Sequence, residues 1–201
     1  MSSYFAGLAL MLSLIVAIGA QNLFVLRQGL RREYVWVVVA ICAVSDAVLT
    51  VAGIAGVGAV VETHPTVLAI VRWAGAVFLL VYGLLAAKRA WRPKVLEPSE
   101  AAEPKRTTLA SVVATCLALT WLNPHVYLDT VFLLGSIGAN NALPWVFAAG
   151  AITGSVVWFT ALGFGARALA PVLSTPRAWR ILDALIAVVM IALAVGLALS
   201  A

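Results

Sequence analysis

Six long apolar stretches run along this chain, and the polar segments between them are short. A helix needs about 20 mainly apolar residues to cross the hydrocarbon core of a bilayer, and each stretch reaches roughly that length. Their expected bounds are 4–26, 36–61, 67–87, 109–137, 143–166 and 181–200. Composition agrees, because 64% of the residues are apolar, 10% are charged and the mean hydropathy is +1.07. The pattern therefore predicts an all-α integral membrane protein with six transmembrane helices.

The first stretch differs from a secretory signal peptide. It is longer than a signal-peptide core, has no basic segment before it, and carries Gln21 and Asn22 where small residues would precede a cleavage site. We expect it to remain in the mature protein.

Basic residues lie almost entirely in three of the segments that flank the apolar stretches. Short cytoplasmic loops accumulate Lys and Arg, so this distribution predicts orientation. The exception is Arg72, which can extend from the start of the third stretch to the membrane interface. Both termini are therefore expected on the extracytoplasmic side, and the net charge of +5 reflects topology and not a nucleic-acid partner. The other 12 of the 13 basic residues are Arg27, Arg31, Arg32, Lys88, Arg89, Arg92, Lys94, Lys105, Arg106, Arg167, Arg177 and Arg180.

A proline-containing segment of mixed charge divides the chain in the middle. Residues 92–107 are expected to form a flexible cytoplasmic linker between a first three-helix repeat, 1–91, and a second, 108–201. Because three is odd, the second half must cross the membrane in the opposite sense to the first. The sequence thus predicts two inverted three-helix repeats, each with a broken first helix.

Polar interruptions occur at matching places in the first stretch of each half: Gly19-Ala20-Gln21-Asn22 and Asn123-Pro124. Non-helical backbone at membrane depth persists only where protein or a watery cavity satisfies it, so such breaks indicate a binding site. Asn123 has the form of an N-cap followed by proline at the first helical position, and we expect Asn22 to cap the matching half-helix. Helix N-termini suit a carboxylate. The alternatives are a simple proline kink and an interhelical hydrogen bond.

Two carboxylates lie deep within apolar stretches, Asp46 in the second and Asp129 in the fourth. An Asp at the centre of a membrane helix costs about 2.5–3.5 kcal/mol on insertion scales, which favours a functional role, here the binding of a cation or a proton. His125 lies four residues before Asp129, so the two side chains share a helix face and form a candidate proton relay. The competing hypothesis is that these groups serve packing only.

The residues at both breaks resemble the LysE/ArgO family of basic amino acid exporters. The first motif is Gly19-Ala20-Gln21-Asn22-Leu23-Phe24-Val25-Leu26-Arg27-Gln28-Gly29, and the second is Asn123-Pro124-His125-Val126-Tyr127-Leu128-Asp129-Thr130. The resemblance extends over the whole chain in length, number of stretches and central linker. Relatives that export neutral amino acids carry Pro-Gly-Pro-Asn in place of Gly-Ala-Gln-Asn, and this difference favours lysine or arginine.

The resemblance implies a secondary transporter, without cofactor, that exports L-lysine or L-arginine across the bacterial cytoplasmic membrane. An inside-negative potential of 100 mV opposes export of one positive charge by about 2.3 kcal/mol, so exchange for an inward proton, by alternating access, is expected. The sequence does not determine whether the protein forms a homodimer. The expected substrate-binding residues are Gln21, Asn22, Asp46, Asn123 and Asp129, and the expected proton-coupling residues are Asp46, His125 and Asp129.

Two other functions remain as alternatives. A membrane thiol-disulfide electron carrier would need Cys42 and Cys116 to meet, although they lie at non-equivalent places in the two halves, which favours ordinary buried thiols. A divalent-metal exporter would use His125, Asp129 and Asp46 as ligands, but no His-rich loop or thiolate pair accompanies them. The absence of a nucleophile elbow and of a phosphate-binding loop argues against an enzyme.

Other polar and small residues have simpler interpretations. Asp183, near Arg180, is expected to compensate a helix dipole. Trp121 and Trp158 are expected to pack near mid-membrane. The spacing of Gly150 and Gly154 matches a helix-contact motif. Whether Arg27 and Gln28 lie at the membrane edge or inside a bent helix stays open.

Overall fold

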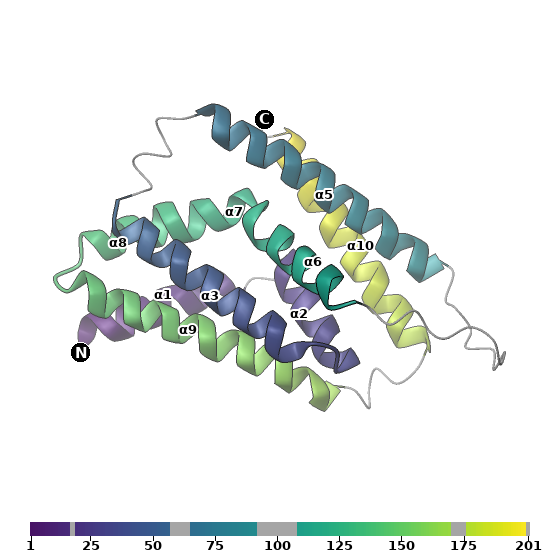
Figure 1. The fold of residues 1–201 in the computed structure, drawn as a ribbon, viewed down its shortest axis with the longest axis horizontal. Helices are drawn as coiled ribbons and strands as arrows, with labels where there is room; N and C mark the ends of the chain where they lie inside the picture. Colours follow the sequence, from purple (N-terminus) through teal and green to yellow (C-terminus); the bar gives the residue numbers. More distant parts are fainter. Residues whose placement is uncertain (17–18, 57–64, 92–107, 170–175, 200–201) are drawn as a thin grey trace.

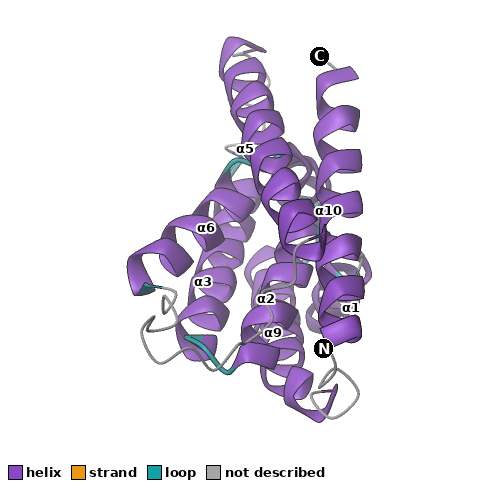
Figure 2. Ribbon diagram, turned by 90° about the vertical axis from the view of Figure 1, so that its right-hand side faces the viewer, coloured by secondary structure: helices purple, strands orange, loops and turns teal. Residues whose placement is uncertain are grey.

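The computed structural model describes residues 1–16, 19–56, 65–91, 108–169 and 176–199, and this part of the chain contains helices but no strand (Figures 1 and 2). The predicted all-α class is therefore confirmed. In chain order the elements are α1 (Ser2–Ile15), α2 (Ala20–Arg31), α3 (Val35–Ile54), α5 (Pro65–Trp91), α6 (Leu109–Trp121), α7 (Pro124–Val126), the π-helix η1 (Tyr127–Leu134), α8 (Gly135–Ala139), α9 (Pro144–Gly165), the 3-10 helix η2 (Ala166–Leu169) and α10 (Pro176–Leu199).

Four of the predicted stretches form segments that are long and apolar enough to cross a membrane singly, namely 35–54, 73–91, 144–168 and 179–199. The other two are bent pairs, because α1 meets α2 at 84° and α6 meets the segment 124–139 at 56°. Counting each pair as one span gives the six that the sequence predicts. The expected linker 92–107 lies outside the described residues, as do 57–61 of the second stretch and 200 of the last.

The six candidate spans, with each bent pair counted as one, pack against one another in specific pairs. Helix α5 runs alongside α10, and the two form a pair at one side of the molecule (Figure 1). The first span lies on the fifth through contacts of α1 and α2 with α9, and the fourth lies on the second through contacts of α6, η1 and α8 with α3. Helices α3 and α9 also pack against each other. Each half of the chain therefore packs mainly against the other half.

Close approach in this packing depends on glycine, because a Cβ atom would meet backbone of the facing helix. A side chain at Gly7 would meet the Phe147 carbonyl, and one at Gly150 would meet the Tyr4 carbonyl. Gly150 and Gly154 thus use their helix-contact spacing within the chain, to bring α9 against α1. Likewise Gly75 lets α5 lie directly on the carbonyl of Leu122, beside the break between α6 and α7.

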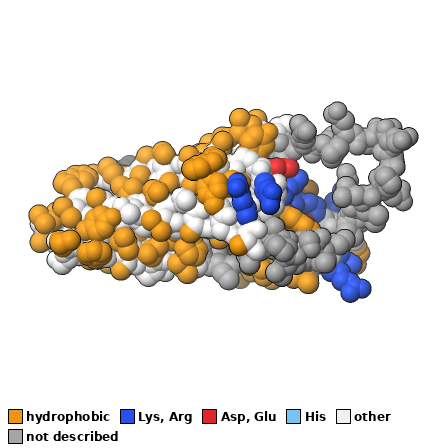
Figure 3. All heavy atoms as spheres, turned by 90° about the horizontal axis from the view of Figure 1, so that it is seen from below, with side chains coloured by type: hydrophobic (Ala, Val, Ile, Leu, Met, Phe, Trp, Pro, Cys, Tyr) orange, Lys and Arg blue, Asp and Glu red, His pale blue; other side chains and the backbone are white. Residues whose placement is uncertain are grey.

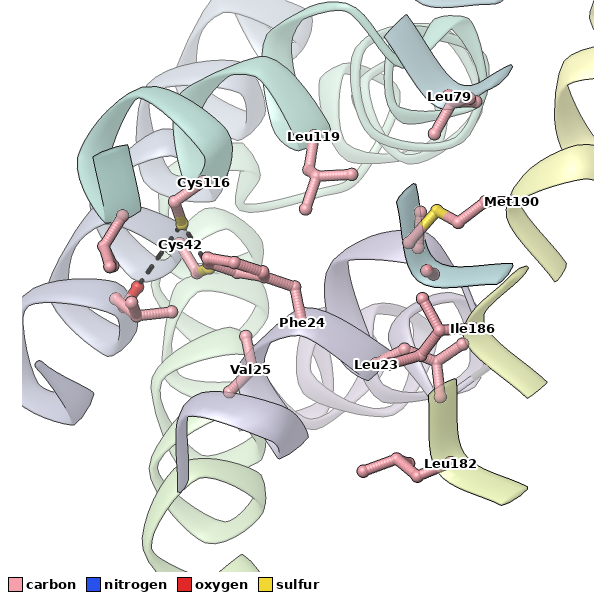
Figure 4. Close-up of a cluster of buried hydrophobic side chains, with 14 of the residues drawn as sticks. Leu23, Phe24, Val25, Cys42, Leu79, Cys116, Leu119, Leu182, Ile186 and Met190 are labelled. Carbon is pink, nitrogen blue, oxygen red and sulfur yellow. Dashed lines mark hydrogen bonds between the residues drawn. The ribbon is translucent and has the colours of Figure 1, made fainter. Parts of the chain in front are cut away.

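Helix α2 lies in the middle of the largest buried cluster (Figure 4). Leu23, Phe24 and Val25 are at most 4% exposed and contact apolar side chains of the surrounding helices. Arg27 and Gln28 are buried on the same helix, so the part of the first bent pair that follows the break is enclosed by protein.

The face shown in Figure 3 is apolar over much of its area, and Lys and Arg side chains gather near one end of it. Large side chains that face outward include Trp73, Val77, Leu84, Val188 and Val195, on the α5–α10 pair. A surface of this kind suits contact with lipid and agrees with a multi-pass membrane protein.

Candidate functional site

All six site residues predicted from the sequence line one cavity of about 280 Å³. This volume is close to the lower end of the range for small-molecule pockets, about 300–1,000 Å³. The cavity is bounded by the end of α1, the start of α2, the middle of α3 and the second break, with one residue from α10. Its lining comprises Met11, Leu14, Ile15, Gly19, Ala20, Gln21, Asn22, Asp46, Asn123, His125, Val126, Asp129, Thr130 and Leu193.

The first break lies between Ile15 and Ala20, slightly before the Gly19–Asn22 segment expected from the sequence. Helix α1 ends at Ile15, and α2 starts at Ala20 with Gly19 as an extended N-cap residue. The prediction that Asn22 caps this half-helix is wrong, because its side chain lies inside the first turn and donates to the Ile15 carbonyl at 2.6 Å. That carbonyl belongs to the last turn of α1, where intrahelical partners are missing. Asn22 therefore ties the end of α1 to the start of α2.

Gln21 precedes Asn22 in the first turn of α2 and also lines the cavity. Its side-chain nitrogen is buried and has no hydrogen-bond partner among the described residues, although the side chain lies near the Cys42 thiol. A buried donor without a partner carries a cost, which a ligand in the cavity could remove.

The second break has the cap that the sequence predicts. The Asn123 side-chain oxygen accepts a hydrogen bond from the His125 backbone N–H at 3.2 Å, and Pro124 occupies the first helical position. The Tyr127 hydroxyl donates to the Trp121 carbonyl at 2.8 Å, which satisfies a backbone group that the end of α6 leaves free. After α7 the chain continues as the π-helix η1 and not as the expected α-helix. Single π-turns inside helices often occur at functional sites.

Asp46 is the more deeply buried of the two predicted carboxylates, with 5% of its surface exposed. Its Oδ2 atom accepts a hydrogen bond from the Ser155 hydroxyl of α9 at 2.6 Å. No Lys or Arg among the described residues forms an ion pair with it. A carboxylate in this setting retains the capacity to bind a cation or a proton.

Asp129 is half-buried on η1 and lines the same cavity as Asp46. His125, which is exposed on α7, is close enough to Asp129 for an electrostatic interaction. The structure thus brings the expected His125–Asp129 pair to the cavity, and no Lys or Arg of the described residues belongs to the lining. The cavity is acidic at Asp46 and Asp129, and the N-termini of α2 and α7 reach it at Gly19 and Asn123.

Both mid-membrane tryptophans make hydrogen bonds that the sequence did not predict. The Trp158 indole N–H donates to the Asn22 side-chain oxygen, and the Trp121 indole N–H donates to the Ser45 hydroxyl, each at 3.2 Å. Trp158 and Ser155 each donate to a residue of the lining, and Trp121 donates to the neighbour of Asp46, but none of these three donors is itself part of the lining. Trp158 and Ser155 lie three residues apart on α9, a helical spacing that was the only available sequence signal.

A second polar cluster lies outside the cavity, where α2, α5 and α10 meet. Asp183 pairs with Arg27 at 3.0 Å and with Arg89 at 3.2 Å. The expectation that Asp183 serves a helix dipole beside Arg180 is therefore incomplete, since Arg180 instead donates to the Ala90 carbonyl. The side chains of Arg27 and Asp183 are only 9% and 10% exposed. This cluster is a buried ion network.

The two cysteines are close together despite their non-equivalent places in the two halves. Their sulfur atoms are 3.5 Å apart and both residues are fully buried (Figure 4). Both are free thiols. Among the described residues, no three His, Cys, Asp or Glu side chains are grouped so that they could hold a metal ion.

Comparison with known proteins gives one consistent family. The family model described as LysE type translocator matches residues 12–201. A putative amino-acid transporter of Mycobacterium tuberculosis is 54% identical over 92% of this chain and 91% of its own length. An arginine exporter protein ArgO of Salmonella enteritidis is 46% identical over 98% and 93%, and the lysine exporter LysE of Corynebacterium glutamicum is 38% identical over 99% of each chain.

No solved structure matches the chain. The assignment rests on the family model and on the relatives, which are transporters and not enzymes. Because the model covers nearly the whole sequence and the relatives align over nearly their full lengths, the chain belongs to the LysE type translocator family.

Proposed function

We propose that this protein exports a cationic amino acid, L-lysine or L-arginine, from the bacterial cytoplasm. The observation that carries the proposal is the composition of the cavity: Asp46 and Asp129 line it, no Lys or Arg in the described part of the chain does, and two half-helices begin at it. An acidic wall suits a cationic side chain, and helix N-termini suit a carboxylate. The names of the lysine- and arginine-exporting relatives agree with this substrate class.

Within the cavity, we assign different parts of the substrate to different residues. The backbone N–H groups at the starts of α2 and α7, with Gln21, Asn22 and Asn123 beside them, receive the α-carboxylate. Asp46 and Asp129 offset the cationic groups. The buried nitrogen of Gln21, which has no hydrogen-bond partner among the described residues, is available to a carboxylate oxygen.

Export of a cation needs an energy source, because an inside-negative potential of 100 mV opposes it by about 2.3 kcal/mol per charge. We propose exchange for an inward proton. Asp46, Asp129 and His125 are the titratable groups of the cavity wall. A carboxylate that is protonated when empty and ionised when the amino acid is bound would make proton release and substrate binding mutually dependent.

We propose that export occurs by alternating access, the mechanism typical of transporters built from inverted repeats. The contacts between helices support the inverted repeat. An inverted repeat matches spans 1, 2 and 3 of the first half with spans 4, 5 and 6 of the second. Under this match the contact between spans 1 and 5 corresponds to the contact between spans 4 and 2. The contacts between spans 2 and 5 and between spans 3 and 6 each correspond to themselves, so the set of contacts has the symmetry of the repeat. Basic residues at the end of α2, the end of α5 and the start of α10 support a shared cytoplasmic end, with both termini outside.

The test is efflux from cells that lack their own basic amino acid exporters, loaded with lysine- or arginine-containing dipeptides. Expression of this chain should speed the loss of radiolabelled lysine or arginine, but not of leucine. A protonophore should slow the efflux. Equal rates with and without the protein for both cationic amino acids would refute the proposed function.

A further inference from the structure

Two predicted substrate-binding residues are held by side chains of one helix that does not line the cavity. Ser155 and Trp158 of α9 donate hydrogen bonds to Asp46 of α3 and Asn22 of α2, at 2.6 Å and 3.2 Å. Residues three apart on a helix share a face, so both donors point toward the cavity wall from behind. We propose that Ser155 and Trp158 are positioning residues that set the affinity for the transported amino acid; this inference rests on the proposed function.

Ser155 fixes one half of the Asp46 carboxylate. The serine is fully buried, and its hydroxyl is the only hydrogen-bond donor to this carboxylate among the described residues. A hydrogen bond to a charged acceptor is stronger than one between neutral groups. With Oδ2 held by Ser155, the orientation of the carboxylate is set and Oδ1 remains for a cation in the cavity.

Trp158 determines which way the Asn22 amide faces. An indole N–H can only donate, so the atom that it meets must be the amide oxygen of Asn22. The amide nitrogen is then directed to the Ile15 carbonyl, across the break between α1 and α2. Removing the indole donor would take away the hydrogen bond that holds the oxygen side of this amide and would weaken the geometry of the first turn of α2.

Helix α9 is suited to this role because its own position is tightly constrained. Gly150 brings it against the backbone of α1 at Tyr4, and Gly154 lies against Leu8 and Met11 of the same helix. On another side α9 packs against α3, the helix that carries Asp46. Donors on a closely packed helix lose little further freedom when they hold a neighbour, which is the condition for a pre-organised site.

The experiment measures efflux against internal arginine concentration for Ser155→Ala and Trp158→Phe. Alanine removes the hydroxyl with a small change in volume, and phenylalanine keeps an aromatic ring without the N–H group. We expect the half-saturating concentration to rise about tenfold for Ser155→Ala and about threefold for Trp158→Phe, because a charge-assisted hydrogen bond is stronger than a neutral one. The saturating rate should stay within about twofold of wild type, because the groups that contact the substrate remain.

Two further variants separate positioning from general packing. Ser155→Thr keeps a hydroxyl and should restore most of the affinity. Thr153→Ala removes another α9 hydroxyl, which bonds only to the Ala149 carbonyl of its own helix, and should change neither parameter. An unchanged half-saturating concentration in both Ser155→Ala and Trp158→Phe, or an equal effect of Thr153→Ala, would overturn the inference.

A second measurement distinguishes this inference from the proposed function. Arginine binding to the purified protein is followed by the rise in melting temperature, which requires no transport. A wild type that exports arginine, with an alanine variant that matches its affinity, refutes the positioning role alone. A wild type that exports neither lysine nor arginine refutes the proposed function.

Discussion

Buried or half-buried carboxylates occur in two regions of this molecule, and their surroundings differ. In the cavity, Asp46 and Asp129 have no Lys or Arg within ion-pair distance among the described residues. Where α2, α5 and α10 meet, Asp183 is shared by Arg27 and Arg89. The cavity carboxylates therefore lie beside an open volume without a Lys or Arg partner among the described residues, whereas the carboxylate of the other region is compensated within the protein.

This difference indicates that the cavity carboxylates serve binding, whereas the paired carboxylate serves stability. Isolated buried charge is expensive, and a fold that retains it at a cavity gains by binding a cation or a proton there. A paired buried charge is already compensated by its partners, and removing one partner leaves the others uncompensated. We therefore expect substitutions in the cavity to change transport, and substitutions in the arginine cluster to change stability.

The largest effect is expected for Asp46→Asn and Asp129→Asn, measured separately by efflux of labelled arginine. Each removes one charge that faces the cationic substrate, and losing a buried charge pair typically costs several kcal/mol, so export should fall by about 100-fold or more. The melting temperature should stay level or rise, because neither carboxylate has a Lys or Arg partner among the described residues that the substitution would leave uncompensated.

Glu33→Gln is the matched control for this pair, since Glu33 is a carboxylate in a partly exposed ion pair with Arg31. Pairs of this kind contribute about 0–1 kcal/mol, so neither export nor stability should change appreciably. Normal efflux in both cavity variants would show that the carboxylates are not a substrate or proton site.

A smaller effect on transport, with the larger effect on stability, is expected for Asp183→Asn. The change leaves Arg27 buried beside Arg89 without a compensating charge, at a cost of about 3–5 kcal/mol. The melting temperature of the purified protein should fall by roughly 10 °C, given about 2–4 °C per kcal/mol for a chain of this size. Export per folded molecule should stay within about twofold.

Arg180→Ala provides the comparison for Asp183→Asn, because Arg180 is exposed and, among the described residues, donates only to the Ala90 carbonyl. Its melting temperature should remain near that of wild type. If Asp183→Asn instead abolished export while leaving the melting temperature unchanged, the contrast between the two regions would fail.

The residues of the acidic cavity could be predicted from the sequence because polar residues within long apolar stretches are easily recognised. Against an apolar background, Gln21, Asn22, Asp46, Asn123 and Asp129 are the residues that hydrocarbon would reject, and the structure brings all of them to one volume. The helical stretches followed from the same physics. The Asn123 cap was predicted correctly because it depends on two adjacent residues only.

Features that depend on contacts between distant segments could not be predicted. The end of α1 at Ile15 determines what Asn22 bonds to, so its role as a tie across the break is a tertiary property. Asp183 has Arg180 nearby in sequence, but the packing of α2 and α5 supplies its actual partners. Ser155 resembles an ordinary small residue of an apolar helix until α3 is placed beside it.

Substitution of the two cysteines is expected to have the smallest effect on export. It tests a buried contact that carries no charge. Cys42 and Cys116 are fully buried with their sulfur atoms 3.5 Å apart, so the proximity that a thiol-disulfide carrier needs is present. Exchange also needs access of an attacking thiolate, which complete burial opposes. The double variant Cys42→Ala, Cys116→Ala should therefore export arginine within about twofold of wild type, with a stability loss of about 1 kcal/mol per site from lost packing. Dithiothreitol should leave wild-type efflux unchanged; a folded double variant without export would favour the redox function over the cavity proposed above.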